Sequence, residues 1–293
     1  MSATAPRTVT GAQSSVLRLR RRPKLLGVFV WGYMVWALAP ALIAMAFSFN
    51  DGRSRSIWQG LSLRWWTQDP GSLAHNDVFV GALQHSLTLA LLNVLIAVPL
   101  GVGLAITLSR WFGRGAGAVS LLATIPLVVP ELVLAISLFL LFTQLLSIIE
   151  LGTVAQVVGQ VTFTLPFVVV ITRGRMASIS TDLEEAAMDL GAPPLSALRL
   201  VLVPLLQPAL VASVVIAFAL SIDDFVVTQY LSSDASTQTV PMLIYNTARG
   251  SATPALNATV TVLVAITVLL VALAALLYFA LGRRQGLKTM EQL

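Results

Sequence analysis

The stretch DLEEAAMDLGAPP, residues 182–194, is polar in a chain whose other long stretches are apolar. It carries four carboxylates within eight residues and ends in a glycine and a proline pair. Apolar runs such as VVIAFAL (214–220) and LLVALAALLYFAL (269–281) follow it. This interruption between apolar regions is the strongest indication of fold and function in the sequence.

The composition is that of a membrane protein. Of 293 residues, 57% are hydrophobic and 11% are charged, and the mean hydropathy is +0.86. A net charge of +5 can indicate nucleic acid, but the basic residues flank apolar runs, so no nucleic-acid partner is expected. The chain has no cysteine, and His75 and His85 alone do not predict a metal site.

The apolar runs predict an all-α integral membrane protein with six transmembrane helices. Each run is long enough to cross a hydrocarbon core of about 30 Å at about 1.5 Å per residue. The helices are expected at about residues 25–47, 81–109, 119–146, 154–172, 200–222 and 255–281. The fourth is shorter and less apolar, because it carries Gln156, Gln160 and Thr162.

Lysine and arginine set the expected orientation. Fourteen of the 18 lie in the two tails, the loop after the second helix and the segment between the fourth and fifth helices. The positive-inside rule then puts both termini in the cytoplasm. The expected organisation is a basic cytoplasmic tail (1–24), the first transmembrane helix with an external segment (25–80), a five-helix core (81–281) and a cytoplasmic C-terminal tail (282–293).

Residues 181–194 have the pattern of a short amphipathic helix followed by a sharp turn. Thr181 and Glu184 have the spacing of a capping box, and the acidic first turn suits the helix dipole. Gly191 is expected just beyond the helix, and Pro193-Pro194 can start a second short helix. The spacing predicts one apolar face made of Leu183, Ala186, Ala187 and Leu190.

Such a short helix is marginal alone in water and needs a surface to pack on. One candidate is the lipid surface, but interfacial helices are usually rich in lysine and arginine, whereas this one is acidic. The other candidate, which the acidity favours, is a groove on a soluble cytoplasmic partner.

Glu185-Ala186-Ala187, three further residues, Gly191, nine residues and then Val201-Leu202-Val203-Pro204 resemble the EAA signature of permease subunits of bacterial ABC importers. The family pattern ends more usually in Ile-x-Leu-Pro, so valine at 201 and 203 is a conservative departure. The resemblance implies a type I ABC importer permease (MetI-like) fold, in which the loop at about 173–199 enters clefts on ATP-hydrolysing subunits. The coupling residues it implies are Glu184, Glu185, Ala186, Ala187, Asp189, Gly191 and Pro204.

The chain has no phosphate-binding loop of its own. Its two lysines, Lys24 and Lys288, are not preceded by glycine, so the G-x-x-x-x-G-K-[ST] pattern does not occur. We expect no catalytic residue, cofactor or metal in this chain; ATP and Mg would bind partner ATPase subunits. The resemblance implies two such subunits, a second permease chain and an extracytoplasmic substrate-binding protein, assembled in a bacterial cytoplasmic (inner) membrane.

The resemblance extends over about residues 45–281. AFALSIDDFVVTQYLSS (217–233) and TVPMLIYNTARGSATPALNATVTV (239–262) are similar to the end of spermidine/putrescine importer permeases, nearest to the C-type chain. QHSLTLA (84–90), PELVLAISL (130–138) and VTFTLPFVVV (161–170) resemble the same subunit. A polyamine substrate is implied, although importers of other organic cations, small organic molecules or iron share parts of these segments.

Carboxylates near apolar segments are the candidate substrate contacts. Glu131 is expected inside the third helix, where its carboxylate should face the bundle interior or a cavity. It either contacts a cation or pairs with a polar group on a neighbouring helix or subunit. Asp223 and Asp224 are expected to end the fifth helix at the external face, with Tyr230 and Tyr245 nearby in sequence.

Carboxylates and aromatic faces both hold ammonium groups, so the aspartates and tyrosines suit a polyamine. The alternatives for the aspartates are solvation of a helix end or contact with the binding protein. Since consecutive helical residues point about 100° apart, at most one aspartate would face the pore directly.

Two other functions compete with that of an ABC importer permease. An ion-coupled secondary transporter would account for the helices and Glu131 but not for the EAA loop. An intramembrane aspartyl protease needs carboxylates on different helices, which adjacent aspartates do not provide. Trp58, Trp65 and Trp66 of the external segment are expected to be interfacial anchors, or to help dock the binding protein.

Overall fold

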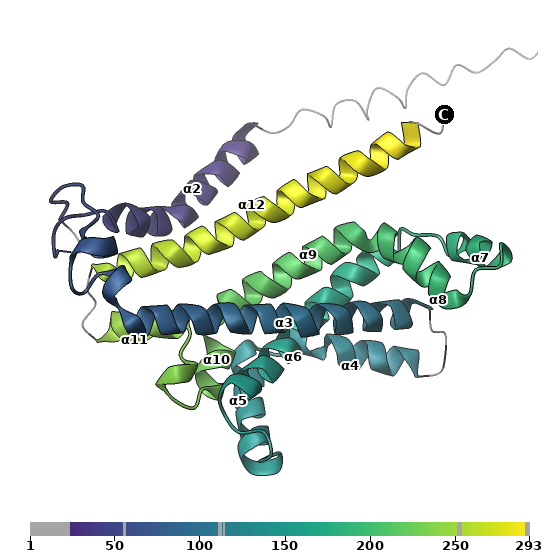
Figure 1. Cartoon of the computed structure of the whole chain (residues 1–293), viewed down its shortest axis with the longest axis horizontal. Coiled ribbons are helices and arrows are strands. Elements are labelled where there is room, and N and C mark those ends of the chain that lie inside the picture. The colour runs from purple at the N-terminus through teal and green to yellow at the C-terminus, as the bar shows by residue number, and fades with distance from the viewer. Residues whose placement is uncertain (1–23, 55–56, 111–112, 114, 251–253, 291–293) are drawn as a thin grey trace, which may run out of the picture.

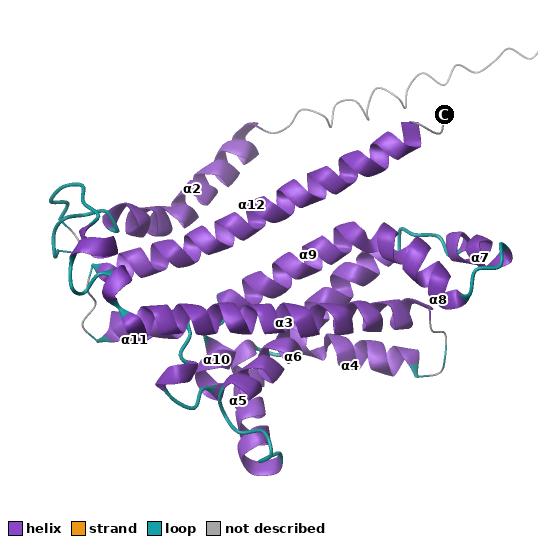
Figure 2. Ribbon diagram, viewed as in Figure 1, coloured by secondary structure: helices purple, strands orange, loops and turns teal. Residues whose placement is uncertain are grey.

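The computed structural model describes residues 24–54, 57–110, 113, 115–250 and 254–290. In this part the chain is helical, with one isolated antiparallel bridge between Asn50 and Leu61 and no strand (Figure 2). Of the two predicted cytoplasmic tails, residues 1–23 and 291–293 lie outside the described residues.

Five helical segments of the described chain are long and apolar enough to cross a membrane. Three of them are α2 (Lys24–Phe47), α3 (Asp77–Arg110) and α6 (Thr153–Met176). A fourth runs from Pro194 to Ile222 through α8 (Pro194–Ala197), a π-helical turn η5 (Leu198–Leu202) and α9 (Val203–Ile222), and the fifth lies in α12 (Ala255–Met290). Two further helical segments, Ala116–Val128 and Glu131–Leu145, form a bent pair. Counted as one span, this pair brings the number of spans to six, the number that the sequence predicts.

The prediction of a continuous third helix over 119–146 is wrong. The chain forms α4 (Ala116–Val128) and α5 (Glu131–Leu140), continued by the π-turn η4 (Leu141–Leu145), and the two parts are bent by 108°. Pro130 is the cause, because it has no N–H for the helix and its ring drives Val129 into an extended conformation (φ −71°, ψ 128°). Glu131 therefore begins a helix instead of lying inside one.

The centre of the molecule is a packed bundle of α3, α6 and α9. Leu89 of α3, Val168 of α6 and Ala217 of α9 are fully buried there. The long α12 lies beside α2 and also contacts α9 (Figure 1). Along α2 the apolar side chains are exposed, as expected for a helix that faces lipid or another membrane chain.

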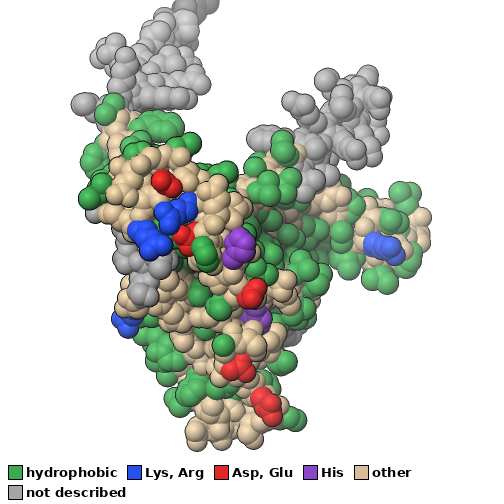
Figure 3. All heavy atoms as spheres, turned by 60° about the vertical axis from the view of Figure 1, so that its left-hand side comes forward, with side chains coloured by type: hydrophobic (Ala, Val, Ile, Leu, Met, Phe, Trp, Pro, Cys, Tyr) green, Lys and Arg blue, Asp and Glu red, His purple; other side chains and the backbone are tan. Residues whose placement is uncertain are grey.

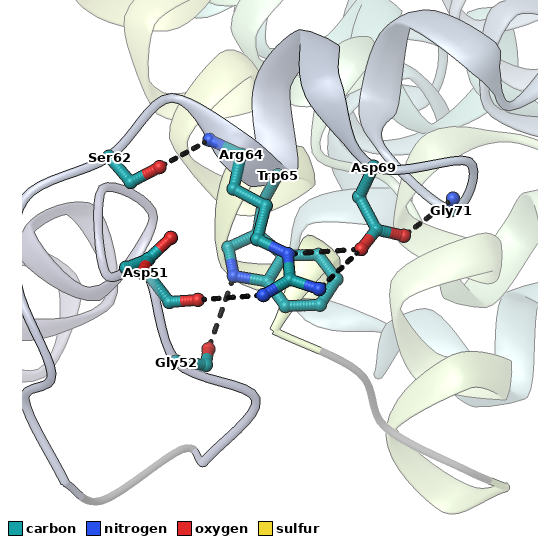
Figure 4. Close-up of polar contacts among 7 residues, drawn as sticks. All are labelled: Asp51, Gly52, Ser62, Arg64, Trp65, Asp69 and Gly71. Carbon is teal, nitrogen blue, oxygen red and sulfur yellow. Dashed lines mark hydrogen bonds and ion pairs between the residues drawn. The ribbon is translucent and has the colours of Figure 1, made fainter.

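Residues 48–76, which we name the cap, form a folded unit after α2. They contain the π-turn η2 (Arg64–Gln68) and the 3-10 turn η3 (Leu73–His75). Trp65 is 5% exposed and donates to the Gly52 carbonyl (Figure 4). Trp66 is half-buried and donates to the Ser48 carbonyl, so both tryptophans pack within the cap.

Within the cap, Arg64 and Asp69 form an ion pair with Nη2 and Oδ2 3.0 Å apart, which joins the two ends of η2 (Figure 4). The backbone N–H of Gly71 and the Arg64 guanidinium hold the pKa of the Asp69 carboxyl below its usual range. The end of the molecule that carries the cap also gathers acidic, basic and histidine side chains, while hydrophobic side chains cover much of the rest of the visible surface (Figure 3).

The other short helices follow the fifth span or precede it. After α9 come α10 (Val226–Leu231), the 3-10 turn η6 (Ala235–Thr237) and α11 (Val240–Arg249). Before α9 comes α7 (Asp182–Asp189), which lies at the end of the molecule opposite the cap (Figure 1). The polar stretch and the cap are thus on opposite sides of the bundle.

Candidate functional site

The polar stretch folds as the two-turn helix that the sequence predicts. Gly191, just beyond α7, has φ +89°, a value that residues with a Cβ rarely adopt. Its N–H donates to Met188 at 2.9 Å, and the N–H of Ala192 donates to Ala187 at 3.1 Å. This is the Schellman pattern, so Gly191 is the C′ residue that ends α7 before α8 begins at Pro194.

The predicted capping box at Thr181 is wrong. Thr181 has helical backbone angles and makes no side-chain cap hydrogen bond. The Glu184 carboxylate instead forms an ion pair with Arg110, the last residue of α3. The Glu184 side chain, which would complete the capping box, therefore binds Arg110 of α3 instead.

The predicted apolar face of α7 is largely uncovered in this chain, and no residue of α7 is buried. Leu190 is 91% exposed, Leu183 is half-exposed, and Leu195 of α8 continues the surface. Glu185, Ala186 and Asp189 are exposed, Ala187 is half-buried, and Pro204 is half-buried in the first turn of α9. Exposed apolar side chains next to a polar rim are typical of an interaction surface. The coupling roles of these residues stay a prediction.

The three predicted carboxylates lie around one cavity of about 490 Å³. Glu131 enters from the start of α5, and Asp223 and Asp224 enter from the end of α9. The other walls come from α6, α9 and α12. We name this space the carboxylate cavity. Its residues are Glu131, Phe163, Ala219, Leu220, Asp223, Asp224, Leu263, Val264, Thr267 and Val268.

Both aspartates line this cavity, and the expectation that at most one of them would face the pore directly stays a prediction. The expectation assumed helical spacing, but α9 ends at Ile222 and Asp223 is its C-cap. Asp223 is exposed, whereas Asp224 is 6% exposed and lies close enough to Glu131 to interact with it.

Asp224 is held by hydrogen bonds from two directions. Gln160 of α6 donates to Oδ2 at 3.2 Å. The backbone N–H groups of Val227 and Thr228 donate to Oδ1 and Oδ2, at 3.1 and 3.2 Å, so Asp224 also caps α10. A buried carboxylate needs such donors, and here they fix its position beside the cavity.

The two predicted tyrosines are not among the residues that line the carboxylate cavity. Tyr245 packs on Phe225 with ring centroids 4.6 Å apart, and the Arg249 guanidinium lies 4.6 Å from the Tyr245 ring centroid. Tyr230 is about 38% exposed. The aromatic side chain in the cavity wall is Phe163, so a contact of either tyrosine with substrate stays a prediction.

Sequence reasoning missed the polar residues that hold this region together. Gln156 is fully buried, contacts His85 of α3 at 2.8 Å and donates to the carbonyls of Thr228 and Thr237. Gln160 lies one turn further along α6. Two glutamines four residues apart in an apolar helix were the available signal, but their partners lie 61 to 81 residues away in sequence. Among the described residues, no group of three or more His, Asp or Glu side chains is arranged to bind a metal ion.

Comparison with known proteins gives one family match. The family described as binding-protein-dependent transport system inner membrane component matches residues 97–286. The chain is 33% identical over 249 residues to the putrescine transport system permease protein PotI of Escherichia coli (strain K12), covering 83% of this chain and 86% of that protein. It is 34% identical over 247 residues to the spermidine/putrescine transport system permease protein PotC of the same strain, covering 84% and 91%.

Solved structures share the fold at low sequence identity. A bacterial ABC transporter involved in the import of the acidic polysaccharide alginate has a TM-score of 0.71 at 17% identity, covering 91% of this chain and 99% of that one. An inward-facing MetNI methionine ABC transporter has a TM-score of 0.59 at 19% identity, covering 72% and 99%. The MetI-like fold predicted from the sequence is confirmed.

Proposed function

The chain belongs to the family of binding-protein-dependent transport system inner membrane components and is a permease subunit of an ABC importer; we propose that polyamines such as spermidine and putrescine are its substrates. The observation that carries the proposal is the carboxylate cavity. It gathers Glu131, Asp223 and Asp224, and no lysine or arginine is among its lining residues. A chain with several ammonium groups suits such a site, because each ammonium finds an anionic partner.

The apolar walls of the cavity suit the rest of a polyamine. Leu263, Val264 and Val268 of α12 line the cavity together with the carboxylates, and Phe163 adds an aromatic side chain. Methylene groups between the ammonium groups can pack on these side chains, and an ammonium can lie over the Phe163 ring. The substrates named for PotI and PotC have this chemistry.

The energy for transport comes, in this proposal, from ATP hydrolysed on partner subunits. The assembly contains a second permease chain, two ATPase subunits that bind ATP and Mg, and an extracytoplasmic binding protein. The exposed surface of α7 and α8 enters a cleft on one ATPase subunit. Closure of the ATPase pair then rocks the helix bundle between inward and outward openings. Both termini and α7 face the cytoplasm, and the cap faces outward.

Parallel uptake measurements test the substrate. The complex, coexpressed with its partners and reconstituted in liposomes with ATP, is offered spermidine, putrescine, a monovalent organic cation and ferric iron. We expect uptake of one or both polyamines and little of the other two. Uptake of the monovalent cation or iron alone would contradict the polyamine assignment and leave the importer intact.

Site-specific cross-linking tests the docking surface. Because the chain has no cysteine, Leu190→Cys supplies a single reactive thiol at the exposed C-cap of α7. We expect a thiol cross-linker to join it to the ATPase subunit. Leu61→Cys in the cap, which is 83% exposed, is the matched control and should give no such product. Equal cross-linking from both positions would contradict the docking surface.

A further inference from the structure

One ion pair joins α7 to the helix bundle. Arg110 is the last residue of α3, and its Nη2 contacts Oε1 of Glu184 in the first turn of α7. The two side chains are 26% and 18% exposed, so both groups are largely removed from solvent. The other ion pair among the described residues lies in the cap.

Little else holds α7 to α3. None of the residues of α7 is buried, and its packing partners are α8 and η5, which follow it in sequence. Arg110 has no second anchor for its guanidinium in the described chain, since its Nε is buried without a hydrogen-bond partner. The ion pair therefore compensates for the burial of both charges and ties α7 to a helix 74 residues earlier in sequence.

The helix that receives this contact reaches the opposite end of the molecule. At its far end α3 carries His85, which contacts Gln156, and Gln156 holds the carbonyls of Thr228 and Thr237. Between these ends α3 packs along α6 and α9. A displacement of α3 at Arg110 would thus act on the elements that surround the carboxylate cavity.

We propose that Arg110 is the positioning residue that transmits movement of α7 to α3, through its ion pair with Glu184. This inference rests on the proposed role of α7 as the element that docks on the ATPase. It assigns Arg110 a role in the transport cycle in addition to its contribution to membrane orientation. The residue touches neither substrate nor ATP in this scheme.

Uptake and ATP hydrolysis, measured in the same liposomes with the complete complex, test the proposal. Arg110→Gln should retain ATP hydrolysis but lower the substrate taken up per ATP by about tenfold, within the range of measured coupling between sites. Arg173→Gln is the matched control, because the structure places Arg173 in α6, where it contacts Ser120 of α4 at 2.7 Å, and not in the predicted coupling loop. Its uptake per ATP should equal that of the wild type.

A charge exchange separates the ion pair from other effects of the residues. The double variant Arg110→Glu, Glu184→Arg should recover part of the lost coupling. Recovery should be incomplete, since the exchange places each charge at the unfavourable end of a helix dipole. Wild-type coupling in Arg110→Gln, or no recovery in the exchange when both single variants are defective, would overturn the proposal.

A distance measurement keeps the proposal testable if the variants transport poorly. Spin labels on Thr107→Cys of α3 and on Leu190→Cys, directly after α7, occupy exposed positions in a chain without native cysteine. The wild-type pair should give one narrow distance distribution, which broadens in Arg110→Gln; an equally narrow distribution would overturn the proposal. Absence of ATP-dependent uptake by the wild-type complex would instead contradict the proposed function.

Discussion

The Gln160 amide donates a hydrogen bond to the buried Asp224 carboxylate, with Nε2 and Oδ2 3.2 Å apart. The same amide group donates to the Ser221 carbonyl and its oxygen accepts from the Ser221 hydroxyl. Gln160 therefore connects the middle of α6 with the end of α9 and with the start of α10, next to the carboxylate cavity. Its side chain sets where one of the three carboxylates lies.

Replacement of Gln160 by leucine should disturb this connection. The change keeps the volume similar but removes the donor to Asp224, and a lost hydrogen bond to a charged group costs about 1.5–3 kcal/mol. We expect a lower midpoint of thermal unfolding and reduced uptake. Thr162→Val is the matched control on the same helix, because Thr162 is half-buried and bonds only to the Val158 carbonyl in the described chain. Equal effects of the two changes would contradict the assignment.

Replacement of Glu131 by glutamine should weaken substrate binding without affecting assembly. The change removes one charge from the carboxylate cavity at nearly constant shape. We expect the KM for spermidine uptake to rise about tenfold, the low end of what a charge-assisted hydrogen bond contributes. Glu150→Gln, at an exposed position outside the cavity, should leave KM unchanged. Failure of the Glu131 variant to assemble would support a structural carboxylate instead.

Replacement of Gly191 by valine should uncouple ATP hydrolysis from transport. No atom lies within 4 Å of a Cβ added there, so the penalty comes from the backbone at φ +89° and not from a clash. A left-handed conformation costs a residue with a Cβ about 1–2 kcal/mol. Gly191→Asn should be milder, because asparagine tolerates this region better. Wild-type uptake per ATP in the valine variant would contradict the role of this turn.

Replacement of Gly159 by alanine should destabilise the contact between α6 and α10. An added Cβ would lie 2.5 Å from Leu231 and 2.7 Å from Val227, and overpacking of this kind costs about 1–3 kcal/mol. Gly174→Ala in the same helix meets nothing within 4 Å and should stabilise by about 0.5–1 kcal/mol. Thermal unfolding of the two variants should therefore shift in opposite directions; shifts of the same sign would contradict this packing.

Features that depend on local sequence were predictable. The spans follow from runs of apolar residues, and the turn after α7 follows from Gly191 and the prolines, because each of these signals lies within a few residues of the structure it specifies. Pro130 is visible in the sequence, but the third helix was predicted to run through it as one continuous segment over 119–146. The effect of this proline depends on whether neighbouring helices re-satisfy the freed backbone groups.

Features that depend on contacts between distant segments were not predictable. Glu184 has a capping-box spacing with Thr181, yet Arg110 from another helix takes its carboxylate. Asp223 and Asp224 share one cavity because the helix ends just before them, and helix ends are among the least certain features of a sequence pattern. Trp65 has the sequence context of a lipid anchor, but the fold of the cap buries it.

The measurement that tests the central claim most directly is the energy source for polyamine uptake. Liposomes with the complete complex and external binding protein are given labelled spermidine, either with ATP at the ATPase side or with an imposed ion gradient and no ATP. ATP-driven importer function predicts accumulation of spermidine with ATP and none with the gradient alone. Accumulation driven by the gradient without ATP would contradict it and favour an ion-coupled transporter.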